Sequence, residues 1–253
     1  MAILELRQIA KNFGGLRAID RLDLEVHRGE ILGVIGPNGS GKTTLFNIIT
    51  GVFAPTSGQV VFDGIDITGW RPHQIAQLGL IRSFQLTALY PEFSVIQNAL
   101  VAKHMEAKVG FWGALLNTPG RRKRDLEMRD KAEHILELAE LRPFQEQLAA
   151  TLSYGWQRSV VLAIALAANP KLLLLDEPVT ALAPARVQAI MDLLARIRER
   201  GTTVAIVEHN LRAIMGCCDR IVVMNFGRKI AEGKPEEIRD NPEVIEAYLG
   251  RQT

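Results

Sequence analysis

The chain has 253 residues, of which 47% are hydrophobic and 23% are charged, as in a soluble globular protein large enough to bury a substantial core. Its formal net charge is only +2, so no overall basic field favours a nucleic-acid partner, and we expect none. The longest apolar run, residues 160–168, is far shorter than the roughly 20 residues that cross a bilayer.

Residues 1–20 show no signal-peptide pattern, because charged residues interrupt them. The adjacent Cys217 and Cys218 are unsuited to a structural disulfide and fit a reducing compartment, where they would serve as small apolar side chains. We therefore expect a cytosolic protein that reaches a membrane only through a partner.

The N-terminal region alternates apolar and polar residues, which is typical of half-exposed antiparallel strands. Residues 22–26 show this alternation, and residues 59–67 predict a hairpin with its turn at Asp63-Gly64. Between these two stretches, residues 31–35 form a continuous apolar run that predicts a buried strand. Residues 43–50 predict the start of a helix.

The segment that follows the predicted strand has the spacing of a phosphate-binding loop, and it reads Gly36-Pro37-Asn38-Gly39-Ser40-Gly41-Lys42-Thr43. Its glycines let backbone N–H groups turn toward phosphate oxygens, and the helix N-terminus adds partial positive charge. Lys42 is expected to reach the β- and γ-phosphates of a nucleotide, and the Thr43 hydroxyl to bind Mg²⁺. The alternative is a glycine-rich turn that binds nothing, but the flanking strand and helix favour phosphate binding.

Residues 91–159 carry almost no strand signal and predict a helical subdomain inserted into an α/β core. Ser94 and Gln97 predict a capping box before a helix over residues 95–105. After a break at residues 117–120, a second helix is expected from about Asp125 to Leu141.

The remainder of the chain predicts further strands of a parallel sheet, which are short apolar runs at residues 172–175, 204–207 and 221–224. A helix is expected over residues 184–200, with Pro184 in its first turn. Asp176 directly follows the first of these strands, where it can hold Mg²⁺ through water. Glu177 is placed to orient or deprotonate an attacking water, although a strand that ends in a charged turn would look the same.

The run Leu152-Ser153-Tyr154-Gly155-Trp156-Gln157-Arg158 resembles the signature motif of ABC ATPases, whose usual form is L-S-G-G-Q. Its place between the phosphate-binding loop and Asp176-Glu177 strengthens the resemblance. Three further segments look like family elements: Ser83-Phe84-Gln85 like the Q-loop, Glu208-His209 like the switch histidine, and Asn12-Phe13-Gly14-Gly15 like the segment whose aromatic ring stacks on adenine.

The resemblance implies an α/β fold, namely a P-loop NTPase (RecA-like) core with an antiparallel β subdomain and an inserted α-helical subdomain. Residues 1–253 would be a single ABC nucleotide-binding domain, with the core and β subdomain in 1–90 and 160–253 and the helical signature subdomain in 91–159. The implied ATP-binding residues are Phe13, Gly36, Pro37, Asn38, Gly39, Ser40, Gly41, Lys42, Thr43 and Thr44, with Ser153 and Gly155 completing the site of the opposite subunit. The implied Mg²⁺ ligands are Thr43, Gln85 and Asp176, and the implied catalytic residues are Glu177, His209, Gln85 and Lys42.

More specific segments resemble the longer ATP-binding subunit of branched-chain amino-acid importers, and these are residues 13–18, 82–85, 110–119, 152–155 and 244–250. This resemblance implies a second ABC ATPase subunit in a homo- or heterodimer, transmembrane permease subunits and, indirectly, an extracytoplasmic solute-binding protein. The chain would then lie at the cytoplasmic face of the inner membrane. Its expected permease contacts, which could equally be core residues, are Leu86, Leu89, Tyr90 and Phe93.

The sequence departs from the family pattern at several positions, all outside Lys42, Thr43 and the Asp176-Glu177 pair. Trp156 stands where the signature usually has Gln, and Val161 and Ile164 make the following helix more apolar. Ala181 and Ala183 occupy the places of the expected D-loop glycine and Asp/Asn, and Asn210 replaces the usual Asp after the switch histidine. These changes keep open a catalytically weakened regulatory ATP-binding subunit. A soluble ABC ATPase that acts on nucleic acid or the ribosome is a further alternative.

Overall fold

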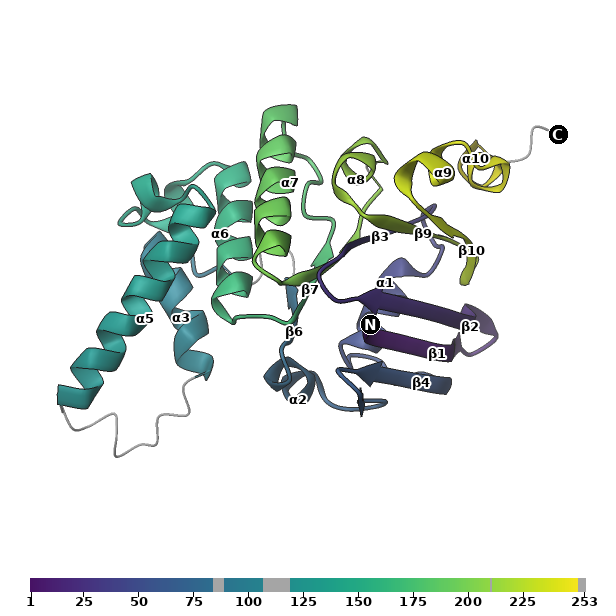
Figure 1. Cartoon of the computed structure of the whole chain (residues 1–253), viewed down its shortest axis with the longest axis horizontal. Helices are drawn as coiled ribbons and strands as arrows, with labels where there is room; N and C mark the ends of the chain where they lie inside the picture. The colour runs from purple at the N-terminus through teal and green to yellow at the C-terminus, as the bar shows by residue number, and fades with distance from the viewer. Residues whose placement is uncertain (84–88, 107–118, 210, 250–253) are drawn as a thin grey trace. The chain divides into compact units, whose positions relative to one another are not determined.

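The structure is a computed structural model of the whole chain, and it describes residues 1–83, 89–106, 119–209 and 211–249 (Figure 1). The chain divides into two compact units. The first consists of Met1–Arg82 and Lys171–Thr253, and the second is Ser83–Pro170, which contains the segment that we predicted to be helical.

A six-stranded sheet forms the core of the first unit, with the strand order β10-β9-β3-β8-β7-β6. The strands are β3 (Ile31–Ile35), β6 (Leu80–Ser83), β7 (Leu172–Asp176), β8 (Thr203–Val207), β9 (Arg220–Asn225) and β10 (Arg228–Gly233). Strand β3 pairs in parallel with β8 and β9, β8 pairs in parallel with β7, and β9 pairs with β10 antiparallel. Every residue of β3 and β8 is buried, which explains their unbroken apolar runs.

The second sheet of this unit is antiparallel, with the order β2-β1-β4-β5. Its strands are β1 (Ala2–Phe13), β2 (Leu16–His27), β4 (Ser57–Phe62) and β5 (Ile65–Asp66). Residues 22–26 of β2 alternate between buried and exposed, as the sequence predicted. The hairpin turn at Asp63-Gly64 is also confirmed, with φ values of 51° and 79°.

The helices of the first unit are α1 (Lys42–Ile49), α2 (Pro72–Gln77), α7 (Pro184–Glu199), α8 (Leu211–Cys217), α9 (Pro235–Arg239) and α10 (Pro242–Leu249). Pro184 begins α7 as expected, since its missing N–H is not needed in a first turn. Helices α9 and α10 contact the β10 strand near the end of the chain (Figure 1). Cys217 and Cys218 are free thiols, and Cys218 is buried.

The second unit is helical and contains α3 (Val95–Glu106), α5 (Pro119–Leu138), α6 (Tyr154–Ala167) and two short 3-10 turns, η2 (Arg142–Phe144) and η3 (Ala149–Thr151). Helices α3, α5 and α6 contact one another (Figure 1). The capping box is confirmed: the Ser94 N–H donates to Gln97 Oε1 at 2.8 Å, and the Gln97 N–H donates to Ser94 Oγ at 3.3 Å. The predicted start of the second helix at Asp125 is wrong, because Pro119 opens a helix instead of breaking one.

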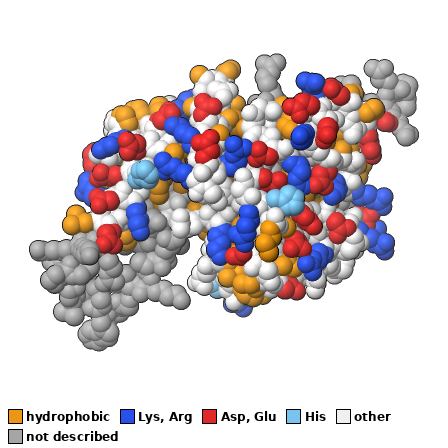
Figure 2. Space-filling model, viewed as in Figure 1, with side chains coloured by type: hydrophobic (Ala, Val, Ile, Leu, Met, Phe, Trp, Pro, Cys, Tyr) orange, Lys and Arg blue, Asp and Glu red, His pale blue; other side chains and the backbone are white. Residues whose placement is uncertain are grey.

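Acidic and basic side chains are interspersed over the face seen in Figure 2, in keeping with the small net charge. In the described part of the chain, no helix is both long and apolar enough to cross a membrane.

Candidate active site

The site is built at the carboxyl edge of the six-stranded sheet, where parallel strands deliver the residues that follow them. The phosphate-binding loop follows β3, Asp176 ends β7, and His209 follows β8. Asp176 is paired with Val207, and the Glu177 N–H donates to the Val207 carbonyl at 2.8 Å. The strand order thus brings residues from three distant parts of the sequence to one edge.

Glycines of the loop are required by close backbone contacts. Gly36 has a φ of 152°, and a Cβ there would lie 2.1 Å from the Met224 carbonyl oxygen. Gly41 has a φ of 104°, and its Cβ would lie 2.7 Å from the Ala18 carbonyl oxygen. The loop is therefore held between β9 and β2 at a separation that only glycine permits.

Lys42 lies in the first turn of α1 and is buried. Its Nζ donates to the carbonyl oxygens of Gly36 at 2.7 Å and Pro37 at 3.0 Å, and it lies 3.3 Å from Ser40 Oγ. Burial lowers the pKa of Lys42, while the negative charges of Glu177 and Asp176 oppose this shift. A partly desolvated ammonium held inside a loop of backbone amides suits an anionic phosphate.

Asp176 is the carboxylate expected to hold Mg²⁺, and its Oδ2 accepts a hydrogen bond from Arg82 at 2.5 Å. Thr43, the expected hydroxyl ligand, is exposed in the first turn of α1, and Gln85 lies outside the described residues. The described residues contain no group of three His, Cys, Asp or Glu that could hold a metal ion. The predicted donors are instead a carboxylate, a hydroxyl and an amide, oxygen ligands that fit Mg²⁺ because this ion keeps several of its waters.

Glu177 and His209 face each other, with 3.6 Å between Glu177 Oε1 and His209 Nδ1. The Glu177 backbone has a φ of 49°, an uncommon conformation for a residue other than glycine. Its second carboxylate oxygen, Oε2, is 3.3 Å from the Thr180 hydroxyl, which donates to it. These contacts place the predicted base beside the predicted switch histidine.

Glu208 is a residue to which the sequence analysis gave no role. Its side chain is completely buried and accepts hydrogen bonds from the backbone N–H groups of Val179 and His209, both at 3.0 Å. It therefore fixes the segment after Glu177 relative to the segment that carries the histidine. An acidic residue directly after a fully buried strand was the available signal.

Phe13, predicted to stack on adenine, ends β1, and its side chain is 42% exposed. Its ring packs edge-to-face against Phe53 with 5.4 Å between centroids, and Lys11 Nζ lies 5.1 Å from its centre. The contacts hold the ring in place and leave it accessible. Adenine stacking by Phe13 stays a prediction.

Ser153 and Gly155 lie in the second unit, at the start of α6. The Ser153 carbonyl accepts the N–H groups of Trp156 at 2.9 Å and Gln157 at 3.0 Å, whereas its hydroxyl makes no capping bond to the helix. Gly155 is buried in the first turn. The helix therefore presents a hydroxyl at its partly positive end, as an anion-binding helix N-terminus would.

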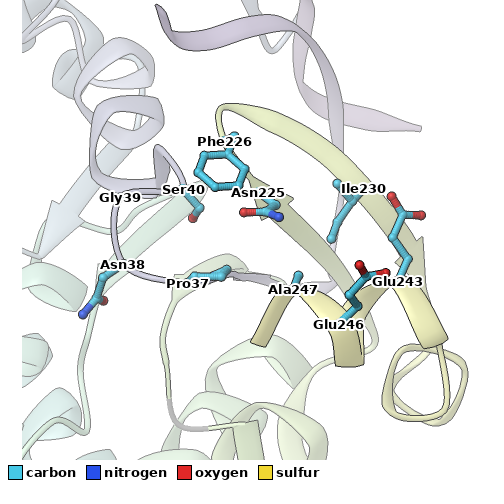
Figure 3. Close-up of a pocket in the computed structure, with 10 residues that line it drawn as sticks. All are labelled: Pro37, Asn38, Gly39, Ser40, Asn225, Phe226, Ile230, Glu243, Glu246 and Ala247. Carbon is cyan, nitrogen blue, oxygen red and sulfur yellow. The ribbon is translucent and has the colours of Figure 1, made fainter. Parts of the chain in front are cut away.

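Beside the phosphate-binding loop lies a pocket of about 520 Å³ (Figure 3). Its lining comes from the loop, the β9–β10 hairpin and α10, and comprises Pro37, Asn38, Gly39, Ser40, Asn225, Phe226, Ile230, Glu243, Glu246 and Ala247. Burial raises the pKa of the Tyr248 phenol on α10, and the backbone of Gly36 opposes this shift. The last described helix therefore reaches the phosphate-binding loop, a contact that the sequence analysis did not predict.

Ala181, where the resemblance predicted a D-loop glycine, has a φ of 62°. This left-handed conformation disfavours alanine relative to glycine. We expect Ala181→Gly to raise the free energy of unfolding by about 1 kcal/mol and the midpoint of thermal unfolding by about 2–4 °C. Calorimetry would test this, with Ala195→Gly inside α7 as the matched control that should lower stability by about 1 kcal/mol. A lower midpoint for Ala181→Gly would contradict the argument.

Comparison with known families gives two matches. A family model described as "ABC transporter" matches residues 19–180. A second model, described as "Branched-chain amino acid ATP-binding cassette transporter", matches residues 228–252, the region of β10, α9 and α10.

Curated relatives match along nearly the whole chain. The high-affinity branched-chain amino acid transport ATP-binding protein BraF of Pseudomonas aeruginosa is 41% identical over 249 residues, which cover 98% of each chain. LivG of Escherichia coli K12, with the same description, is 40% identical over 98% of each chain. A probable LivG protein of Archaeoglobus fulgidus is 37% identical over 100% of this chain and 97% of its own.

Solved structures of similar fold are ATP-binding cassettes of ABC transporters. A nucleotide-free cassette matches with a TM-score of 0.85 and 34% identity, covering 99% of this chain and 100% of its own. A cassette in its ADP conformation matches with a TM-score of 0.86 and 32% identity at the same coverage. A dimeric cassette bound to ADP and Pi has a TM-score of 0.75 and 28% identity, covering 92% of this chain and 98% of its own.

Proposed function

This chain belongs to the ABC transporter family, and we propose that it is the ATP-hydrolysing subunit of an importer for branched-chain or other apolar amino acids. The observation that carries the hydrolytic part is the convergence of buried Lys42 with the facing Glu177 and His209 at one sheet edge. The near full-length similarity to branched-chain amino acid transport ATP-binding proteins supports the class of cargo.

The proposed chemistry assigns each residue a task that follows from its place. Lys42 and the backbone amides of the loop bind the β- and γ-phosphates, and Phe13 stacks on the adenine. Glu177 orients or deprotonates the attacking water, and His209 contacts the γ-phosphate. Thr43, Gln85 and Asp176 would hold Mg²⁺, which neutralises charge on the phosphate oxygens when it is bound.

We propose that the signature residues act in trans. Ser153 and Gly155 would close over the γ-phosphate bound by a second cassette, so that ATP joins two half-sites and hydrolysis releases them. The Ser153 hydroxyl at the start of α6 makes no capping bond to the helix, which supports this role. A solved cassette of this fold is dimeric with bound ADP and Pi, which supports a dimer here without identifying the second subunit.

A pair of exposed aromatic rings in the second unit supports docking to a permease. Tyr90 and Phe93 are 45% and 40% exposed, and their rings stack with 5.4 Å between centroids. The buried side chain of Asn98 fixes this segment, since its amide accepts from the Tyr90 N–H and donates to the carbonyls of Tyr90 and Phe93. Leu89 is only partly exposed, and Leu86 lies outside the described residues. Through such a permease the chain would lie at the cytoplasmic face of the inner membrane, with a solute-binding protein on the far side.

The weakened-subunit alternative makes a prediction at Trp156 and Ala183. Trp156 packs on Phe144 at 4.6 Å between ring centroids, and Ala183 is the N-cap residue before α7 and makes no side-chain capping bond. We expect Trp156→Gln and Ala183→Asn together to raise ATP turnover by the assembled transporter, because they restore polar groups at the partner's site. Ala183→Ser is the control, because serine would cap α7 and stabilise it by about 1 kcal/mol without introducing the amide of asparagine. Any rise in turnover that this variant also shows would come from capping alone. An unchanged turnover in the double variant would count against a weakened site.

The proposed function is tested by capture and reconstitution. A tagged chain is purified from detergent-solubilised membranes, its co-purifying subunits are identified, and the complex is placed in vesicles with the binding protein. We expect ATP-dependent uptake of leucine, isoleucine or valine in preference to lysine or glutamate. A chain that co-purifies with ribosomes instead of a permease, or a complex whose ATPase activity comes entirely from the other cassette, would contradict the proposal.

A further inference from the structure

Arg82 makes a buried connection that the proposed chemistry does not use. Its side chain is only 5% exposed at the end of β6, and Asp176, its ion-pair partner, is 17% exposed. One terminal nitrogen of the guanidinium donates to Asp176 Oδ2 at 2.5 Å, and the other donates to Asn47 Oδ1 at 2.7 Å. The guanidinium carbon also lies 5.7 Å from the centre of the Phe46 ring.

This arrangement connects two elements of the nucleotide site. Asn47 and Phe46 belong to α1, the helix that begins at Lys42 of the phosphate-binding loop, and Asp176 ends β7. The guanidinium is planar, and its two terminal nitrogens donate to two separate acceptors. It therefore fixes the direction of both hydrogen bonds, which a lysine ammonium cannot do. Because the pair is largely buried, salt screens the interaction much less than it screens an exposed pair.

When one oxygen of a carboxylate is held by a hydrogen bond, the direction in which the second oxygen points is also fixed. With Oδ2 of Asp176 bound to Arg82, Oδ1 is the oxygen left for a water of the magnesium shell. Without Arg82, the carboxylate could rotate, and each binding of the metal would have to order it again at an entropic cost.

We propose that Arg82 is a positioning residue for magnesium-dependent nucleotide binding, and that it acts by orienting the Asp176 carboxylate and anchoring it to α1 through Asn47. The inference rests on the proposed role of Asp176 in holding Mg²⁺. It concerns the increase in nucleotide affinity that Mg²⁺ brings, rather than the affinity of the phosphate-binding loop itself.

The test measures ADP affinity of the full chain by calorimetry, once with saturating Mg²⁺ and once with EDTA. In Arg82→Met we expect the affinity gain from Mg²⁺ to fall by about tenfold, the scale of one charge-assisted hydrogen bond, with the EDTA value within about twofold of the unsubstituted chain. Arg82→Lys should recover part of the gain, because it keeps the positive charge but loses the planar group whose two nitrogens donate to separate acceptors.

Asn47→Ala keeps Arg82 and removes only its second anchor, so it serves where Arg82→Met fails to fold, and we expect it to reduce the gain severalfold. Arg198→Met is the control, since it breaks a half-exposed ion pair with Asp219 at 2.7 Å and should leave both affinities unchanged. If the affinity gain from Mg²⁺ is unchanged in the Arg82 and Asn47 variants, whether or not ADP affinity itself falls equally under both conditions, the proposal is overturned. Absence of any gain in the unsubstituted chain would instead overturn the magnesium assignment on which it rests.

Discussion

ATP hydrolysis by a Glu177→Gln variant is expected to fall by about 10²–10⁴-fold, while ATP binding persists. Glutamine has nearly the shape of glutamate and keeps an oxygen for the Thr180 hydroxyl, which lies 3.3 Å from Glu177 Oε2. It cannot accept a proton from water at neutral pH, so the loss falls on the chemical step. Initial rates of phosphate release by the assembled transporter, with calorimetric ATP affinity alongside, provide the measurement.

The same variant should also hold the two cassettes together. If the γ-phosphate joins the half-sites, a chain that binds ATP without hydrolysing it should remain dimeric in ATP and not in ADP, as size-exclusion chromatography would show. Glu199→Gln, at the exposed end of α7, removes an equal charge and should change neither rate nor association. Normal hydrolysis by Glu177→Gln would show that another group performs the catalytic step.

Gly36→Ala is expected to lower nucleotide affinity by about 5- to 150-fold, the equivalent of the roughly 1–3 kcal/mol that overpacking costs. The added methyl carbon would lie 2.1 Å from the Met224 carbonyl oxygen and 2.7 Å from Ser40 Oγ, and no side-chain rotation can relieve a clash with backbone. The loop must move, and it takes with it the Gly36 carbonyl that Lys42 Nζ contacts at 2.7 Å.

A matched control separates this clash from backbone strain. Gly64, in the β4–β5 turn, also has a positive φ, 79°, but a Cβ there would meet nothing within 4 Å. Gly64→Ala should therefore lower stability by about 1 kcal/mol and leave nucleotide affinity unchanged. Equal nucleotide affinities for Gly36→Ala and Gly64→Ala would contradict the argument that close backbone contacts at Gly36 hold the phosphate-binding loop in place.

Local features of the fold could be predicted because they depend on neighbouring residues. The strand over residues 31–35, the Asp63-Gly64 turn and the Ser94 capping box all follow from short-range patterns of burial and hydrogen bonding. The second helix of the helical unit begins earlier than predicted, because Pro119 lies in its first turn, a position to which proline is well suited.

By itself, the sequence determined the phosphate-binding loop, the strands that carry the candidate catalytic residues and the family to which the chain belongs. Only the tertiary structure decided what surrounds those residues. Arg82 donates a hydrogen bond to Asp176, Glu208 joins two backbone segments, and the helix that carries Tyr248 reaches the phosphate-binding loop. The physical reason is that a motif depends on backbone conformation over a few adjacent residues. The partner of a buried charge, in contrast, depends on which distant side chain the strand order brings within hydrogen-bond distance. The spacing of residues in the sequence does not indicate which side chain that is.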